Sequence, residues 1–319
     1  MKWAYRAPPW AVGGHVQTIA SALWSQAGPP IPWQRERWDS PDGDFIDVDF
    51  WSGLAGQPCW VMFHGLEGSS RSHYIRSCAQ AAHAAGWHVA VPHFRGCSGE
   101  LNRLPRAYHS GDHEEIDWIL RRLRLMHGLL HASGVSLGGN ALLRWAQETG
   151  RQAGQVVQSI AAVCAPTDLA ASGHAMGRGF NRWTYTPMFL RTMKQRAEQL
   201  WQRHPGLFDL TALQRANTLY DFDNVFTAPL HGFANTEDYW RRASAQPGLR
   251  DIACPSLIIH ARNDPFVPAH SWPQADEVGP SVVLCQTETG GHVGFLQGHP
   301  PGHLQDLPEC LMQWWRIHS

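Results

Sequence analysis

The chain has 319 residues, of which 43% are apolar and 17% are charged, a composition typical of a folded globular protein. The formal net charge at pH 7 is −1, and the basic run at residues 121–124 lies within an amphipathic helical pattern, so nothing supports nucleic-acid binding. No stretch reaches the roughly 18 apolar residues of a membrane helix, and the first residues lack the apolar core of a signal peptide. The seven cysteines form no CxxC pair and suit a reducing compartment, so we expect a cytoplasmic protein with no integral membrane segment.

The first 35 residues are rich in proline, glycine and tryptophan, and we expect them to wrap the body as an irregular arm. A hairpin is predicted next. The turn sequence Asp42-Gly43 lies between residues 35–38 and 45–50, and apolar residues alternate with polar ones around it.

Short apolar runs alternate with helical patterns from residue 59 onward. The runs that we predict to be buried strands cover residues 59–63, 87–91, 129–132, 156–164, 256–260 and 282–285. Helices are predicted over residues 75–85, around residues 116–123, after residue 139 and over about residues 303–317. Buried strands that alternate with helices predict an α/β fold, with a mostly parallel central sheet covered by helices on both faces.

The alternation stops between residues 169 and 250, where aromatic residues are frequent and no strand pattern is present. We predict that residues 169–250 form a mainly helical lid inserted between two strands, while residues 1–168 and 251–319 form a single catalytic core. The alternative is ordinary helical packing without a gating role.

The segment Gly134-Val135-Ser136-Leu137-Gly138 is the only match to G-x-S-x-G in the chain. It follows a predicted buried strand and precedes a predicted helix, as the nucleophile elbow of a hydrolase requires. Side chains two residues before or after the serine would collide with the neighbouring strand or helix, which explains the two glycines. Ser136 is therefore the candidate nucleophile, and the N–H of Leu137 is a candidate oxyanion donor. The alternative is a glycine-rich turn with an idle serine.

A serine hydroxyl needs a base, and in this type of fold the acid and then the histidine follow the serine along the chain. Asp264 follows the predicted strand at residues 256–260, and His292 follows the next one at residues 282–285. Adjacent strand ends lie about 5 Å apart, so Asp264 can orient His292 as the general base. The competing residues are His260, His270 and His299 for the base and Asp168 for the acid, Asp168 having helix capping as its other role.

The loop after the strand at residues 59–63 fits a second oxyanion donor. The N–H of Leu66 is the candidate, Gly65 allows the backbone to approach the substrate, and His64 is expected to fix the loop by hydrogen bonds. Glu67 is expected to anchor the loop. We predict no cofactor and no metal, because the histidines at residues 109–113 lack further ligands at a recognisable spacing, and we assign Cys97 to packing.

Together these segments resemble the YheT-like branch of the α/β-hydrolases, a group largely of predicted esterases. The matching stretches are residues 15–18, 63–69, 93–100, 102–103, 108–111, 134–140, 263–266 and 290–295, so the likeness covers nearly the whole chain. Gly13-Gly14 stands where the branch usually has Asn-Pro, and the acidic run at residues 112–115 also departs from its pattern.

The resemblance implies the same triad of Ser136, Asp264 and His292, and it implies hydrolysis of carboxylic esters. We therefore expect a serine esterase that works through an acyl-enzyme intermediate on a small-molecule ester, in a group where some relatives act on lipids. The aromatic-rich segment suggests an apolar acyl or alkyl group. The alternatives are an acyltransferase that uses the same triad and, from another class, a non-catalytic binding protein on this scaffold.

Overall fold

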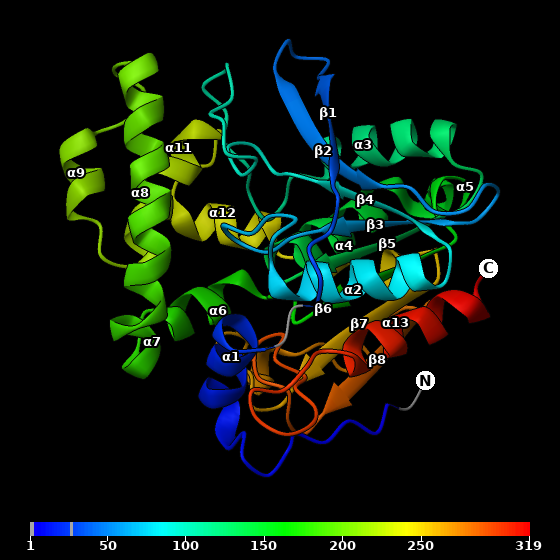
Figure 1. The fold of residues 1–319 in the computed structure, drawn as a ribbon. Helices are drawn as coiled ribbons and strands as arrows, with labels where there is room; N and C mark the ends of the chain where they lie inside the picture. The colour runs from blue at the N-terminus through cyan, green and yellow to red at the C-terminus, as the bar shows by residue number, and fades with distance from the viewer. Residues whose placement is uncertain (1–2, 26–27) are drawn as a thin grey trace.

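The computed structural model describes residues 3–25 and 28–319, and its centre is an eight-stranded sheet (Figure 1). The strands lie in the order β1-β2-β4-β3-β5-β6-β7-β8. They are β1 (Gln34–Asp39), β2 (Phe45–Trp51), β3 (Cys59–Phe63), β4 (His88–Pro92), β5 (Leu130–Val135), β6 (Ser159–Val163), β7 (Ser256–Ala261) and β8 (Val282–Thr287). Strands β3 to β8 pair in parallel, so their carboxyl ends meet at one edge of the sheet, where open α/β sheets place their sites.

The hairpin predicted around Asp42-Gly43 is confirmed: β1 pairs antiparallel with β2, and Trp38 lies opposite Ile46. The strand predicted over residues 156–164 is shorter than expected. Val156 ends helix α5 (Ala153–Val156), two connecting residues follow, and only β6 joins the sheet. The apolar run is continuous there because both elements face the same core.

Helices cover both faces of the sheet, as the alternating pattern predicted. The helices α3 (His113–Met126), α4 (Leu137–Thr149) and α5 pack on one face, with a single turn η1 (Gly150–Gln152) joining the last two. The opposite face is covered by α2 (His73–Ala84) and α13 (Asp306–Ile317), which lie side by side in Figure 1. Since both faces are buried, the strands read as continuous apolar runs.

The regular elements between β6 and β7, a segment that the structure describes throughout, are all helical and joined by loops. They are α6 (Leu169–Met176), α7 (Gly179–Trp183), α8 (Tyr185–Arg203), α9 (Leu210–Arg215), α10 (Leu219–Phe222), the π-helical turn η2 (Asp223–Thr227), α11 (Ala228–Leu230), α12 (Thr236–Ala243) and the turn η3 (Gln246–Asp251). Figure 1 shows α7, α8 and α9 standing clear of the sheet, beyond the strand ends. We call residues 169–250 the helical insertion.

The prediction of an irregular arm over the first 35 residues was wrong in part, because residues 13–23 form helix α1 (Gly13–Leu23). This helix buries the polar residues Gln17, Thr18 and Ser21 and exposes apolar ones, so its hydrophobic pattern is the reverse of an ordinary surface helix. A last short turn, η4 (Ala269–Ser271), follows β7. None of the helices within residues 3–25 and 28–319 combines the length and apolar character that crossing a membrane requires.

Candidate active site

Ser136 occupies a sharp turn between β5 and α4. Its backbone has φ 52° and ψ −121°, a sparsely populated conformation for a residue with a side chain. The turn is held from the neighbouring strand, because the N–H of Ser136 donates to the carbonyl of Val163 over 2.9 Å. The carbonyl of Ser136 accepts from Gly139 and Asn140, which starts the helix at once. These bonds fix the position of the side chain.

The flanking glycines are required by close backbone contacts. A Cβ atom at Gly134 would lie 2.3 Å from the carbonyl oxygen of Gly138, and one at Gly138 would lie 2.4 Å from the carbonyl oxygen of His64. Real Cβ contacts are longer than this, so any side chain at either position would push the helix away from the strands. The steric argument made from the sequence is confirmed.

Replacing Gly138 by alanine should therefore destabilise the protein by about 2 kcal/mol or more, since the new methyl group meets backbone that cannot rotate away. Gly154 in α5 offers a matched control, because a Cβ there would meet no atom within 4 Å. Gly154→Ala should leave stability unchanged or raise it by up to about 1 kcal/mol. Denaturant unfolding of both variants measures the difference, and equal stabilities would contradict the packing argument.

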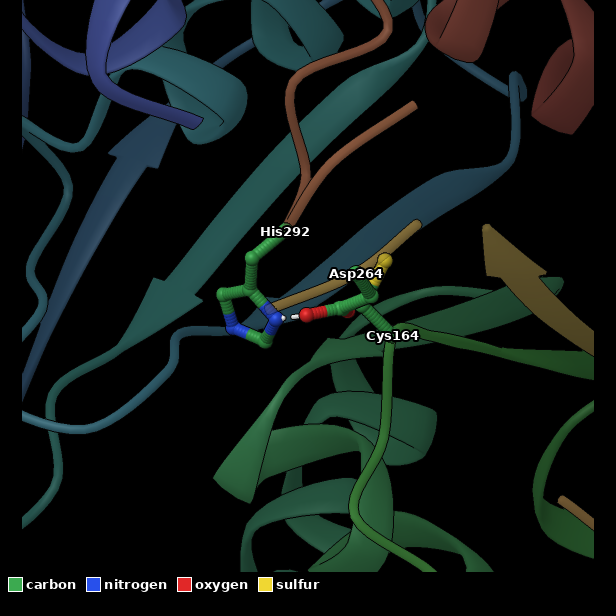
Figure 2. Close-up of side chains that lie close together, drawn as sticks. All are labelled: Cys164, Asp264 and His292. Atoms are coloured by element: carbon green, nitrogen blue, oxygen red, sulfur yellow. Dashed lines mark hydrogen bonds and ion pairs between the residues drawn. The ribbon is translucent and has the colours of Figure 1, made fainter. Parts of the chain in front are cut away.

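His292 and Asp264 meet at the carboxyl ends of β7 and β8, as Figure 2 shows. The Nδ1 atom of His292 lies 2.9 Å from Oδ2 of Asp264, and the carboxylate is fully buried. The other carboxylate oxygen accepts from the N–H groups of Phe266 and Val267, at 2.7 and 3.2 Å. The pair thus fixes the ring with Nδ1 toward the acid, which leaves Nε2 available for a second partner.

The loop that carries His292 is held by helix α1. Gln17 Oε1 accepts from the N–H of Gly290 at 2.8 Å and from the side chain of Asn263 at 2.9 Å. Thr18 Oγ1 accepts from the N–H of His292 at 2.8 Å. These bonds explain why the polar residues of α1 face inward. They also assign a structural role to residues 15–18, which in the sequence stood out only as a stretch that matches the YheT-like branch.

One of the two glycines that depart from the YheT-like pattern sits at this contact. A Cβ atom at Gly14 would lie 1.7 Å from the carbonyl oxygen of Asn263, so the first turn of α1 can approach the Asp264 loop only without a side chain there.

Ser136 and His292 line the same cavity, together with Leu66 and Leu137. The loop after β3 comes close to the elbow, since a Cβ atom at Gly65 would lie 3.2 Å from Cβ of Ser136. Within the described part of the chain, the Ser136 hydroxyl forms no hydrogen bond with His292. The backbone N–H groups of Leu66 and Leu137 also have no hydrogen-bond partner among the described residues, so both are free to bind a ligand oxygen.

His64 joins this loop to the loop after β4. Its Nε2 accepts from the N–H of Phe94 at 3.2 Å, so Nδ1 carries the proton and donates to the carbonyl of Gly65 at 2.8 Å. Burial lowers the pKa of His64 to about 3, so the ring is neutral at physiological pH. These contacts match the loop-fixing role expected of it.

Glu67, three positions after His64, has φ 57° and connects the loop to the helical insertion. Its Oε1 accepts from the Tyr108 hydroxyl at 2.8 Å and from Arg196 of α8 at 2.9 Å. The anchoring role predicted for Glu67 agrees with these contacts. Arg196 was missed, because a basic residue on an amphipathic helix gives no indication of a partner 129 positions away.

Cys164 lies beside the Asp264–His292 pair, and ligand atoms of the three residues come within 4.8 Å of one another (Figure 2). Burial first, and the charge of Asp264 second, raise the pKa of the thiol well above its ordinary value. A metal ion would need Cys164 as the thiolate, and burial together with the charge of Asp264 disfavours that form. The carboxylate of Asp264 already forms a hydrogen bond with His292. The sequence indicated only that Cys164 ends an apolar run.

The competing residues lie elsewhere or have other partners. His260 is buried against Trp272, with ring centroids 5.3 Å apart, and burial lowers its pKa to about 4. His270 and His299 are exposed to solvent. Asp168 accepts from the N–H of Ala171 and caps α6, which was its alternative role. In the segment at residues 109–113, Asp112 pairs with Arg106.

The cavity has a volume of about 180 Å³ and lies between the strand ends and the helical insertion. The insertion supplies mostly apolar side chains to its wall, including Phe189, Met193, Leu200, Phe222, Phe226 and Trp240. The charged residues that it supplies are Arg196 and Asp223. Asp223 lies in the π-helical turn, and its carboxylate accepts from the Thr227 hydroxyl at 2.6 Å and from the Trp240 indole at 2.9 Å. Burial raises the pKa of Asp223 to about 6.

This raised pKa predicts a change of stability with pH. Between the ordinary value of 3.8 and about 6, the folded state holds a proton on Asp223 that the unfolded state has lost, so stability falls as pH rises. Asp223→Asn lacks this effect, so its free energy of unfolding relative to wild type should increase by about 3 kcal/mol between pH of about 4 and about 7. Urea unfolding across that range tests it, with exposed Asp251→Asn as control. A difference independent of pH would contradict the prediction.

Comparison with known proteins agrees with this architecture. A family model described as the alpha/beta hydrolase fold matches residues 61–299. "Putative esterase YheT" of Escherichia coli (strain K12) is 40% identical over 318 residues, which cover 96% of this chain and 92% of that protein. "Phospholipase ABHD3" of Homo sapiens is 25% identical over 304 residues, covering 91% of this chain and 73% of that protein. A solved structure, alpha/beta hydrolase domain-containing protein 10 from mouse, superposes with a TM-score of 0.57 at 12% identity, covering 90% of this chain and 100% of that one.

The family model spans most of the chain, and the sheet has the strand order and elbow that the fold demands, so the protein belongs to the α/β-hydrolase family. Within that family, the 40% identity over nearly the full length of both chains places it in the YheT-like branch. The resemblance stated from the residue motifs is thereby confirmed. The chain is a hydrolase of an esterase- and lipase-like group.

Proposed function

We propose that the protein is a serine esterase in which Ser136, His292 and Asp264 form the catalytic triad. The observation that carries the proposal is the buried hydrogen bond of 2.9 Å between His292 and Asp264 at the wall of the cavity that Ser136 also lines. Asp264 holds the tautomer that keeps Nε2 unprotonated, and Nε2 takes the proton from Ser136 as the hydroxyl attacks an ester carbonyl. The Ser136–His292 contact then forms with substrate bound, as catalytic hydrogen bonds often do.

The backbone N–H groups of Leu66 and Leu137 stabilise the negative oxygen of the tetrahedral intermediate. Each donor of this kind is worth roughly 3–4 kcal/mol of transition-state stabilisation. As the intermediate collapses, His292 gives the proton that it took from Ser136 to the leaving oxygen, which departs as the alcohol and leaves the acyl group on Ser136. Water activated by His292 then attacks the acyl-enzyme and releases the acid.

The substrate that fits best is an ester with an apolar acyl or alkyl chain. Apart from Asp223 and Arg196, the helical insertion presents mainly aliphatic and aromatic side chains to the cavity, and these would remove such a chain from water. The insertion acts as a lid in this proposal, because it forms the wall opposite the strand ends. All seven cysteines are free and buried, which agrees with a cytoplasmic location.

The test combines labelling with a substrate profile. A fluorophosphonate probe should form an adduct with the folded protein, and mass spectrometry of the digest should find it on Ser136. Nitrophenyl esters of graded chain length should show kcat/KM rising from the shortest acyl group to longer ones before the cavity is full. An unlabelled folded protein that hydrolyses none of these esters would contradict the proposal and favour a binding protein on the same scaffold.

A further inference from the structure

Helix α1 presents an apolar face to solvent. Val12 and Leu23 are 74% and 72% exposed, Val16 is also exposed, and the three positions lie at spacings that put them on one side of the helix. The helix contains no charged residue. Its inner side is occupied by Gln17 and Thr18, which hold the His292 loop, so the apolar side chains have no intramolecular surface left to cover them.

The exposed face continues onto the helical insertion. The ring of His15 lies 4.5 Å from that of Phe180 in α7, and Figure 1 shows α1 next to α7. Phe180 and Met188 are exposed, and Trp183 is 80% exposed. We call the surface formed by Val12, Val16, Leu23, Phe180, Trp183 and Met188 the apolar rim. Exposed apolar side chains that gather on neighbouring helices in this way are typical of an interaction site.

The charges next to the apolar rim are positive. Residues 178–191, which carry the rim positions of α7 and the start of α8, contain three arginines and no acidic residue, although the whole chain has a net charge of −1. Arg178 is exposed at the start of α7, and the guanidinium of Arg182 lies 5.7 Å from the Trp183 ring centroid. Apolar and aromatic side chains flanked by arginine are the composition of segments that lie in the interface of an anionic membrane.

The apolar rim lies beside the candidate active site. Tyr185, which contacts His15 and Phe180, packs on Phe266 with ring centroids 4.7 Å apart. Phe266 in turn lies 4.3 Å from the ring of His292 and lines the cavity. A surface bound to the rim would therefore lie next to the wall of the cavity that carries the histidine.

We propose that the apolar rim docks the protein on an anionic lipid surface, with Val16 and Trp183 entering the interface and the arginines of α7 contacting lipid phosphates. The positive charge decides against a second copy of this chain as the occupant, since two identical basic rims would repel each other. The proposal goes beyond ester hydrolysis, because it predicts binding to lipid whether or not the triad acts.

The test is vesicle co-sedimentation of the full chain without any ester substrate. The wild type should bind vesicles of phosphatidylcholine mixed with phosphatidylglycerol more tightly than vesicles of phosphatidylcholine alone, and added salt should weaken the binding. Val16→Ser combined with Trp183→Ser should lower the partition coefficient about tenfold or more. Leu125→Ser is the matched control, since Leu125 is 90% exposed on α3 and lies outside the rim.

Two outcomes would overturn the proposal: equal binding of the double variant and wild type, or no binding of wild type to anionic vesicles. If the apolar rim instead joined two copies of the chain, the wild type would be a dimer by sedimentation velocity and would not bind vesicles, and the double variant would be a monomer. Hydrolysis of a short water-soluble ester should be unchanged in the double variant. If the wild type bound vesicles but hydrolysed no ester, the proposed function would be refuted and the docking proposal would be supported.

Discussion

Ser136→Ala should lower kcat for ester hydrolysis by about 10⁴-fold or more while the fold is retained. The substitution removes only the hydroxyl. The bond that holds the elbow comes from the backbone N–H of residue 136 to Val163, and alanine keeps it. Any residual rate would come from the oxyanion donors and from substrate binding. Steady-state kinetics on a nitrophenyl ester measures the loss, and thermal unfolding measures the fold.

Ser172→Ala is the matched control for this experiment. Ser172 lines the same cavity, and its hydroxyl has no hydrogen-bond partner among the described residues, so the same chemical change is made in the same cavity but away from the β5–α4 turn. Its kcat should stay within a few-fold of wild type. Wild-type kinetics in Ser136→Ala, or equal losses in the two variants, would remove Ser136 from the mechanism.

His292→Gln should cause a loss of comparable size, roughly 10⁴-fold or more in kcat. The amide of glutamine lacks the basicity of an imidazole, so it cannot take a proton from Ser136 or from water. The effect should not add to that of Ser136→Ala, since both residues serve one proton transfer. Kinetics of the single and double variants on the same ester would show this.

The other histidines near the C-terminus provide the comparison for this prediction. His270 and His299 are exposed, so His270→Gln and His299→Gln should leave kcat unchanged. If one of them lost activity and His292→Gln did not, the base would have been misassigned, and the Asp264–His292 hydrogen bond would be a purely structural contact.

Most of the sheet and the geometry of the elbow follow from local sequence. Most strands of the parallel part contain a short apolar run, because both faces of the sheet are covered. The glycines around Ser136 mark a turn that tolerates no Cβ atom. The placement of Asp264 and His292 on adjacent strand ends needed only the order of the strands. The orientation of their side chains came from the structure.

The residues that escaped prediction act through contacts between distant parts of the chain. Helix α1 was not expected because its pattern is reversed: Gln17 and Thr18 are buried only because the His292 loop supplies their partners. Arg196 reaches Glu67 from the insertion, and Asp223 meets the cavity through a π-helical turn. Hydrophobic periodicity cannot predict such contacts, because each depends on how two distant segments are positioned in the folded protein.

The contact between α1 and the His292 loop also bears on the order of events during synthesis. Gln17 leaves the ribosome early, yet the groups it binds are made 273 residues later. Until then Gln17 Oε1 and Thr18 Oγ1 lack the N–H groups that they accept from in the folded protein. Closing so long a loop is slow compared with forming local helices. The nascent chain can therefore complete its sheet from β1 to β7 while the candidate site still lacks His292. Hydrolytic competence would be the last property that the polypeptide acquires.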